Sequence, residues 1–195
     1  FKEWTIFYNP NEEEIDFNKQ STRFNERGLT GCVNFYEVIF FKVNIFGKKG
    51  SCEDVVNIMN SKGQISVIKI ENALYDAADF DFSKIQVDNL IVNDAKNDCV
   101  DLSMGDYHFN KVNLKNCGDK GISVGERSYL NLGSLKINFA DIGVSAKDFS
   151  TVVNERMNIE NANFCIEAKQ KKPEFGGAKI ILKNYSCEGK ISTDR

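Results

Sequence analysis

The chain has 195 residues, of which 42% are hydrophobic and 27% are charged, and its formal net charge is −3. This length and composition are typical of one globular domain with a sizeable core. No stretch approaches the ~20 consecutive apolar residues of a membrane-spanning helix, so we expect no membrane span. The 25 Lys and Arg residues are scattered among 28 Asp and Glu residues. A nucleic-acid partner, which needs a clustered basic face, is therefore not expected.

Residues 1–30 lack the periodicity of the rest of the chain. They combine the charged stretch 11–16 with the large apolar side chains of Trp4, Phe7, Phe17 and Phe24. We interpret them as an N-terminal cap or an irregular leading coil, because a stack of repeats needs its terminal strand edge covered.

From residue 31 onward, a four-residue pattern of small, apolar, polar and apolar side chains recurs, and each copy begins 22 residues after the last. The clearest copies are residues 77–80, 99–102, 121–124, 143–146 and 165–168, and residues 55–58 fit the same register. Alternation with a period of two predicts a short, half-buried strand in every repeat.

A second apolar strand is predicted inside each repeat, and an asparagine follows it every time. These asparagines are Asn72, Asn93, Asn116, Asn138, Asn161 and Asn184. Asparagine tolerates left-handed backbone angles, so we expect tight corners there, with side-chain amides stacked into a ladder.

The pattern predicts an all-β fold, a single right-handed parallel β-helix of about seven coils spanning residues 31–187. Residues 188–195 are expected to form a short polar tail. A leucine-rich repeat has a similar period, but the chain contains only nine leucines and its inward positions favour β-branched and aromatic residues. Exposed solenoid ends would suit flanking domains or end-to-end self-association.

Two segments, residues 93–102 and 116–124, resemble the right-handed parallel β-helix superfamily that contains pectate lyases and polygalacturonases. The resemblance implies a polysaccharide ligand and a bacterial protein that is extracellular, on the cell surface or periplasmic. It implies the fold more strongly than any activity, because such coils occur in enzymes and in non-catalytic proteins alike.

Polygalacturonases place catalytic groups just before the small residue of the pattern, and the matching residues here are Asp76, Asp98 and Lys120. These three are candidate catalytic residues. Asn97 stands where that family has a further carboxylate, and Lys120 stands where it has a histidine, so its hydrolytic mechanism is in doubt. The alternative role for the aspartates is turn formation.

Outward-pointing side chains should align in rows along the solenoid. One row places Asp79 and Asp101 ~5 Å apart on neighbouring coils, with Asp81 about 7 Å along the strand. These three carboxylates could hold Ca²⁺, or the first two could act as an acid–base pair. No cofactor is otherwise expected, and the alternative is an ordinary solvated face.

Basic side chains gather toward the C-terminal end, where they could bind an anionic polysaccharide. Lys147 and Lys169 lie in the outward row, and the interrupted segment 169–177 adds Lys171, Lys172 and Phe175. Pro173 cannot enter a central ladder, so this segment is predicted to be a projecting loop. With Asp79 and Asp101, these residues are the candidate ligand-binding set.

The six cysteines are expected to be mostly buried free thiols. Cys99 and Cys165 occupy equivalent positions but lie three coils apart, which is too far for a disulfide. Cys165 could reach Cys187, and Cys32 could reach Cys52.

Two functions remain open from the sequence. The favoured one is a non-catalytic carbohydrate-binding or structural module, since the catalytic pattern is degraded and seven coils leave little room for the long loops of an active cleft. The other is a polysaccharide lyase, hydrolase or epimerase acting on an acidic glycan.

Overall fold

The computed structural model describes residues 4–11 and 26–193, which form strands and turns and contain no helix. The strands of the first coils are β1 (Trp4–Tyr8), β2 (Gly31–Tyr36), β3 (Ile39–Lys48), β4 (Asp54–Met59), β5 (Lys62–Ala73), β6 (Asp76–Asp81) and β7 (Lys84–Ala95). Those of the later coils are β8 (Val100–Ser103), β9 (Asp106–Cys117), β10 (Lys120–Gly125), β11 (Tyr129–Lys147), β12 (Thr151–Lys169), β13 (Lys179–Cys187) and β14 (Lys190–Thr193).

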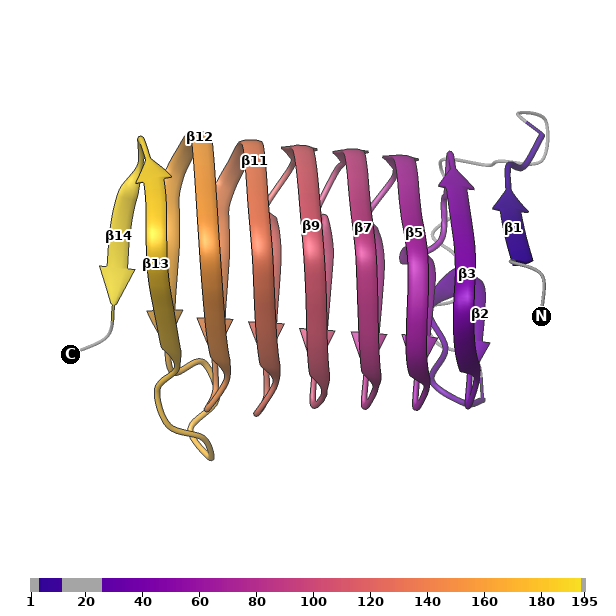
Figure 1. Ribbon diagram of the computed structural model, residues 1–195, viewed down its shortest axis with the longest axis horizontal. Coiled ribbons are helices and arrows are strands. Elements are labelled where there is room, and N and C mark those ends of the chain that lie inside the picture. The colour runs from indigo at the N-terminus through magenta and orange to yellow at the C-terminus, as the bar shows by residue number, and fades with distance from the viewer. Residues whose placement is uncertain (1–3, 12–25, 194–195) are drawn as a thin grey trace.

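Every strand pair is parallel, and the registers confirm the predicted period. Ala78 pairs with Val100, and Val100 in turn pairs with Ile122, so each step advances 22 residues. The long strands β3, β5, β7 and β9 form one wall and the short strands β2, β4, β6, β8 and β10 form the opposite wall, while β11 and β12 continue through both. In Figure 1 the long strands run up the page in front and the short strands run down behind as the chain advances to the left. This arrangement is a right-handed parallel β-solenoid of about seven coils.

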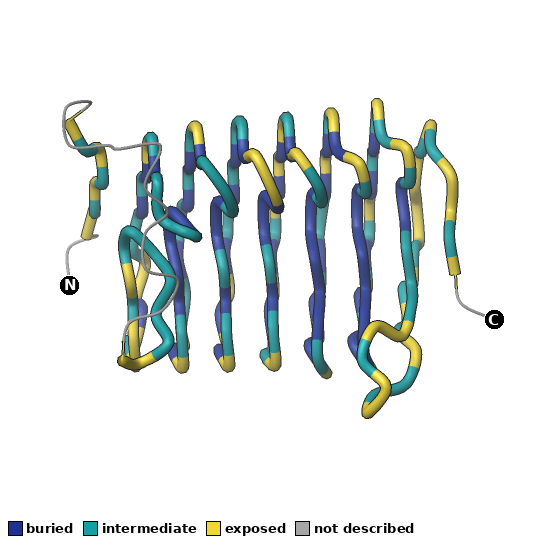
Figure 2. The backbone as a smooth tube through the Cα atoms, turned by 180° about the vertical axis from the view of Figure 1, so that it is seen from behind, coloured by how far each residue is buried: buried dark blue, intermediate teal, exposed yellow. Residues whose placement is uncertain are grey.

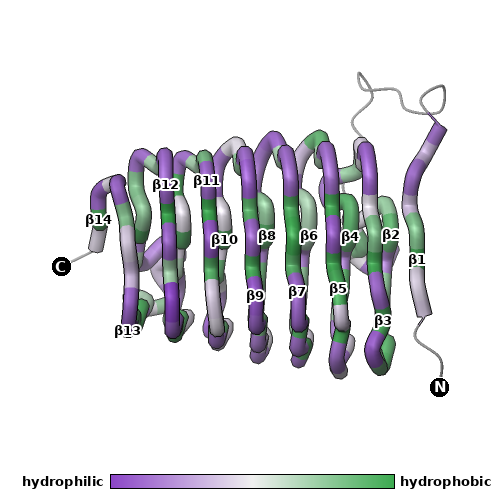
Figure 3. The backbone as a smooth tube through the Cα atoms, turned by 45° about the horizontal axis from the view of Figure 1, so that its top comes forward, coloured by the Kyte–Doolittle hydropathy of each residue, from purple (hydrophilic) through white to green (hydrophobic). Residues whose placement is uncertain are grey.

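The core lies between the two walls and runs the whole length of the rod. Figure 2 shows buried residues at the same height on successive coils, and in Figure 3 the strands β5, β7 and β9 are hydrophobic in their middle portions and hydrophilic toward the turns. Aliphatic residues fill most inward rows, and Phe80, Tyr107 and Phe109 pack as an aromatic cluster with ring centroids 5.5–6.3 Å apart.

Two rows of turn residues adopt positive φ angles, one on each edge of the solenoid. The first row, named here the Asn corner, comprises Lys49, Asn72, Asp94, Asn116, Phe139 and Asn161. The second, named the groove corner, comprises Glu37, Asn60, Phe82, Met104, Arg127 and Phe149.

The predicted asparagine corners are confirmed in part. Asn72, Asn116 and Asn161 take the left-handed conformation, but Asp94 and Phe139 take it in place of the preceding asparagines. Amide rungs do form: Asn116 Nδ2 donates to Asp94 Oδ1 at 2.6 Å, and Asn161 Nδ2 donates to Asn138 Oδ1 at 2.8 Å.

Each end of the chain contributes a strand to the sheet. β1 pairs in parallel with β3, so the leading segment contributes a strand, whereas Phe17 and Phe24 lie outside the described residues. Within the expected polar tail, residues 190–193 form β14, which pairs with β12. Ile191 alternates with polar neighbours there, and this alternation suits a strand.

The expectation of free thiols was wrong, because all six cysteines form disulfides. Cys32–Cys52 and Cys165–Cys187 are the two pairs that the sequence placed within reach, and Cys99–Cys117 is the third. Cys117 ends β9 and faces Cys99 across the Asn corner, and this pair was not among those expected. Three disulfides indicate an oxidising compartment outside the cytoplasm. A search of the described residues for a helix that could cross a membrane found none.

Candidate functional site

The three candidate catalytic residues lie in one row, and the two aspartates hold the backbone of the next coil. Asp76 Oδ1 accepts the Asp98 backbone N–H at 2.7 Å and the Asn97 side-chain amide at 2.6 Å. Asp98 Oδ1 accepts the Lys120 backbone N–H at 2.9 Å and also lies 3.3 Å from Lys120 Nζ. These bonds give the row a structural role, because each carboxylate fixes the entry of the following short strand.

The electrostatics of this row come mainly from burial. Burial raises the pKa of Asp76 to about 7, helped by the nearby Asp98 carboxylate. Burial also raises the pKa of Asp98 to about 6, although Lys120 opposes the rise. For Lys120, hydrogen bonds and charge attraction from Asp119 and Asp98 outweigh burial and raise its pKa. Lys120 is therefore a fixed cation and a poor substitute for an acid–base histidine.

The predicted acidic row is present on the outer face of the short strands. Asp79 pairs with Asp101 on the neighbouring strand, as the register required. The buried Asn57 side chain donates from Nδ2 to Asp79 Oδ2 at 3.0 Å and lies 3.4 Å from Asp81 Oδ2. Asp101 turns one oxygen back to the Leu102 backbone N–H at 3.0 Å.

Crowding of these carboxylates changes their proton affinity. Burial, followed by the charges of Asp54, Asp81 and Asp101, raises the pKa of Asp79 well above its ordinary value. Burial also raises the pKa of Asp81, and it raises that of Asp54 to about 8. Among residues 4–11 and 26–193, no three His, Cys, Asp or Glu side chains are arranged to hold a metal ion. The calcium site at Asp79, Asp81 and Asp101 stays a prediction.

The basic residues predicted to bind ligand are largely engaged by the protein itself. Lys147 is only 8% exposed, and its Nζ donates to Ser123 Oγ at 2.6 Å. Burial lowers the pKa of Lys147. Lys169 lies 2.9 Å from the Glu167 carboxylate, which also accepts a hydrogen bond from Ser145. These two lysines bind polar neighbours instead of extending into solvent.

The loop of residues 170–178 is anchored on the body of the solenoid. Asp148 Oδ1 accepts the backbone N–H groups of Lys171 and Lys172 at 2.7 and 2.9 Å. Lys172 forms an ion pair with Glu126. Phe175 packs edge-on against Phe149, with ring centroids 6.1 Å apart. These contacts fix the loop against the solenoid. Of the four lysines in the candidate ligand-binding set, Lys171 is the exposed one.

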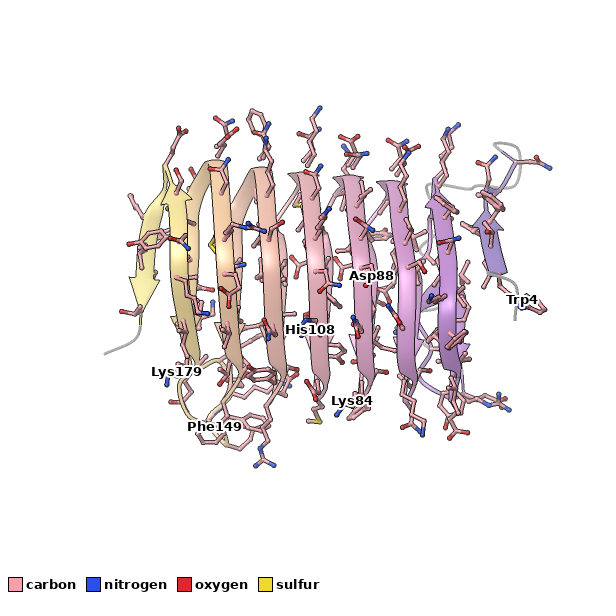
Figure 4. The ribbon with its side chains drawn as sticks, in the orientation of Figure 1. Trp4, Lys84, Asp88, His108, Phe149 and Lys179 are labelled. Atoms are coloured by element: carbon pink, nitrogen blue, oxygen red, sulfur yellow. A yellow bond between two sulfur atoms is a disulfide. The ribbon has the colours of Figure 1, made fainter. Side chains whose placement is uncertain are left out.

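A groove of about 820 Å³ runs along the groove corner over five successive turns. One wall is formed by five of the corner residues, which are Glu37, Asn60, Phe82, Met104 and Arg127. The other is formed by the first residues of the long strands that follow, which are Ile39, Lys62, Lys84 and Asp106. Figure 4 shows Lys84 and Phe149 projecting from this same lower edge.

Buried hydroxyl groups form the floor of the groove. Ser83 Oγ donates to the Asp81 carbonyl at 2.7 Å and lies 3.3 Å from the Ile58 carbonyl one coil away. In the next coil Gly105 replaces the serine, and the Tyr107 hydroxyl takes the equivalent place, 2.9 Å from the Ser103 carbonyl and 2.8 Å from the Phe80 carbonyl. These bonds tie successive turns together beneath the exposed row.

This groove was not expected from the sequence, although the sequence carries a signal for it. A serine or glycine directly follows each of five corner residues, in the dipeptides 60–61, 82–83, 104–105, 127–128 and 149–150. That recurrence has the same period as the strands, but it lies in the turns between them.

Comparison of the chain with protein-family models, with curated proteins and with solved structures returned no match. The likeness to pectate lyases and polygalacturonases is therefore established only at the level of a parallel β-solenoid.

Proposed function

We propose that this protein is a non-catalytic carbohydrate-binding module that holds an acidic polysaccharide outside the cytoplasm. The observation that carries the proposal is the engagement of Asp76 and Asp98 with backbone N–H groups of the next coil. The Oδ1 atoms of both residues bind the backbone of the next coil, which gives these two carboxyl groups a structural role.

The basic loop supports an acidic ligand. Lys171 is exposed in this loop. The Arg127 guanidinium lies 5.4 Å from the centre of the Phe175 ring in the same loop. Aromatic faces beside cationic groups suit sugars that carry carboxylates, because the ring faces pack on C–H surfaces while the cations pair with the acid groups.

A second function, a polysaccharide-active enzyme, is favoured by one observation. The raised pKa of Asp79 beside the Asp101 carboxylate is the condition in which one carboxyl group of a pair acts as a general acid.

Incubation with polygalacturonate, alginate and hyaluronate, with and without Ca²⁺, separates the two functions. We expect binding without new reducing ends or unsaturated products, and about tenfold weaker binding when Lys171 and Lys172 are changed to Ala. Turnover that is lost in the Asp98→Asn or Asp101→Asn variant would establish the enzyme instead.

A further inference from the structure

We propose that the groove corner is the contact surface for a single extended chain of carboxylated sugars lying parallel to the solenoid axis. This inference rests on the proposed function and gives it a site and a ligand geometry that the sequence did not indicate.

The groove corner exposes bulky side chains in a costly backbone conformation. Phe82 and Met104 have φ angles of 50° and 48°, yet their side chains remain 54% and 44% exposed. A left-handed conformation costs a non-glycine residue about 1 kcal/mol. In the Asn corner Phe139 shows this combination at a single turn, whereas the groove corner repeats it at Phe82, Met104 and Phe149. Contact with an external ligand accounts for that repetition.

The spacing of the groove corner residues matches the repeat of a sugar chain. Successive coils lie ~4.8 Å apart, so the five turns of the groove extend over about 19 Å. One sugar of an extended polysaccharide spans close to one coil spacing. A chain lying along the groove therefore meets an equivalent side chain with each successive sugar.

The charged side chains of the groove favour an anionic ligand. The groove contains Lys62, Lys84 and Arg127 against Glu37 and Asp106. Lys84 pairs with Asp106 at 3.2 Å, and Glu37 accepts a hydrogen bond from Asn60. In the part of the chain that the structure describes, no ion pair engages Lys62 or Arg127, and these two cations favour a ligand that carries carboxylates.

The backbone of the groove argues against a peptide strand as the occupant. The N–H groups of Asn60, Phe82 and Met104 each donate to a carbonyl of the next coil at 3.0–3.1 Å. A peptide that adds to a sheet needs free backbone partners along an edge. Since these donors are used, recognition at this surface depends on side chains.

The loop of residues 170–178 closes the C-terminal end of the groove. Phe175 contacts Phe149 and lies beneath Arg127, and the Phe149 backbone N–H donates to the Gly176 carbonyl at 3.1 Å. The basic loop and the groove are thus contiguous, and one sugar chain can contact both.

The test measures binding of a length series of oligogalacturonates by calorimetry. Phe82→Asn removes the ring while keeping a residue suited to the turn, because Asn60 occupies the equivalent position one coil earlier with a φ of 50°. Phe139→Asn is the matched control. Phe139 has a φ of 69° and is 53% exposed, but it lies on the opposite corner.

We expect Phe82→Asn to weaken binding about tenfold, Phe139→Asn to leave it unchanged, and affinity to rise with chain length up to about five sugars, one for each turn of the groove. Equal binding by both variants, together with loss on changing Lys171 and Lys172 to Ala, would overturn the groove assignment and keep the proposed function. An unaltered protein that binds none of the oligomers would overturn both.

Discussion

The two corners of the solenoid solve the same backbone problem with different side chains. Both turn the chain through positive φ angles. The Asn corner uses mostly asparagine and aspartate, which tolerate this conformation and cross-link neighbouring coils through their side chains. The groove corner uses Phe82, Met104, Arg127 and Phe149, which do not favour it.

The disulfides are also confined to one of the two corners. The disulfides Cys32–Cys52, Cys99–Cys117 and Cys165–Cys187 all lie on the side of the Asn corner, and none crosses the groove corner. One edge of the molecule is therefore specialised for stability, and the other edge leaves its side chains available for contact.

The largest expected effect tests the covalent part of this comparison. Replacing Cys99 and Cys117 together by alanine opens an 18-residue loop and should lower the free energy of unfolding by about 3 kcal/mol. Urea unfolding of the unaltered protein and of the double variant, with neither oxidant nor reductant added, measures this difference in the free energy of unfolding. An unchanged transition midpoint would show that the Asn corner does not depend on its disulfide.

The next effect concerns the carboxyl row beside the Asn corner, where the pKa of Asp76 is raised to about 7 and that of Asp98 to about 6. Unfolded aspartate has a pKa of about 3.9, so the folded state binds these protons more tightly. Their contribution is fully present below about pH 4 and is lost as the pH rises through 6 to 7. Thermal unfolding between pH 4 and pH 8 should show a falling Tm, with a smaller fall in Asp76→Asn. A Tm that rises over this range would contradict the assignment.

The smallest expected changes in stability come from single substitutions at the two corners. Asn116→Ala loses the bond to Asp94 and places alanine at a φ of 56°, at a cost of about 1.5 kcal/mol. Phe82→Asn should change stability by less than about 0.5 kcal/mol, because the strain relieved offsets the packing lost. Chemical denaturation measures both. Equal losses would mean that the two corners contribute alike to stability.

The fold could be predicted because strand alternation and a fixed period leave little freedom in how coils stack. Ala78, Val100 and Ile122 align as the spacing required. The Cys99–Cys117 bond was missed because it depends on how two rows meet across a corner, which axial spacing does not define. The groove was missed for a related reason: the direction of the Phe82 side chain follows from the sign of φ in a turn. The ion pair between Lys172 and Glu126 depends on the path of a loop, which has no periodicity to reveal it.

The equal register of neighbouring coils makes the protein extensible. Residues 84–105, for example, form one full coil that begins and ends at equivalent positions. Lys84 pairs with Asp106, and Ser83 has the position that Gly105 has one coil later. A tandem duplication of that segment would lengthen the rod by one increment without disturbing either terminus. Gene-level expansion or contraction would thus change how many equivalent side chains the groove corner presents to solvent.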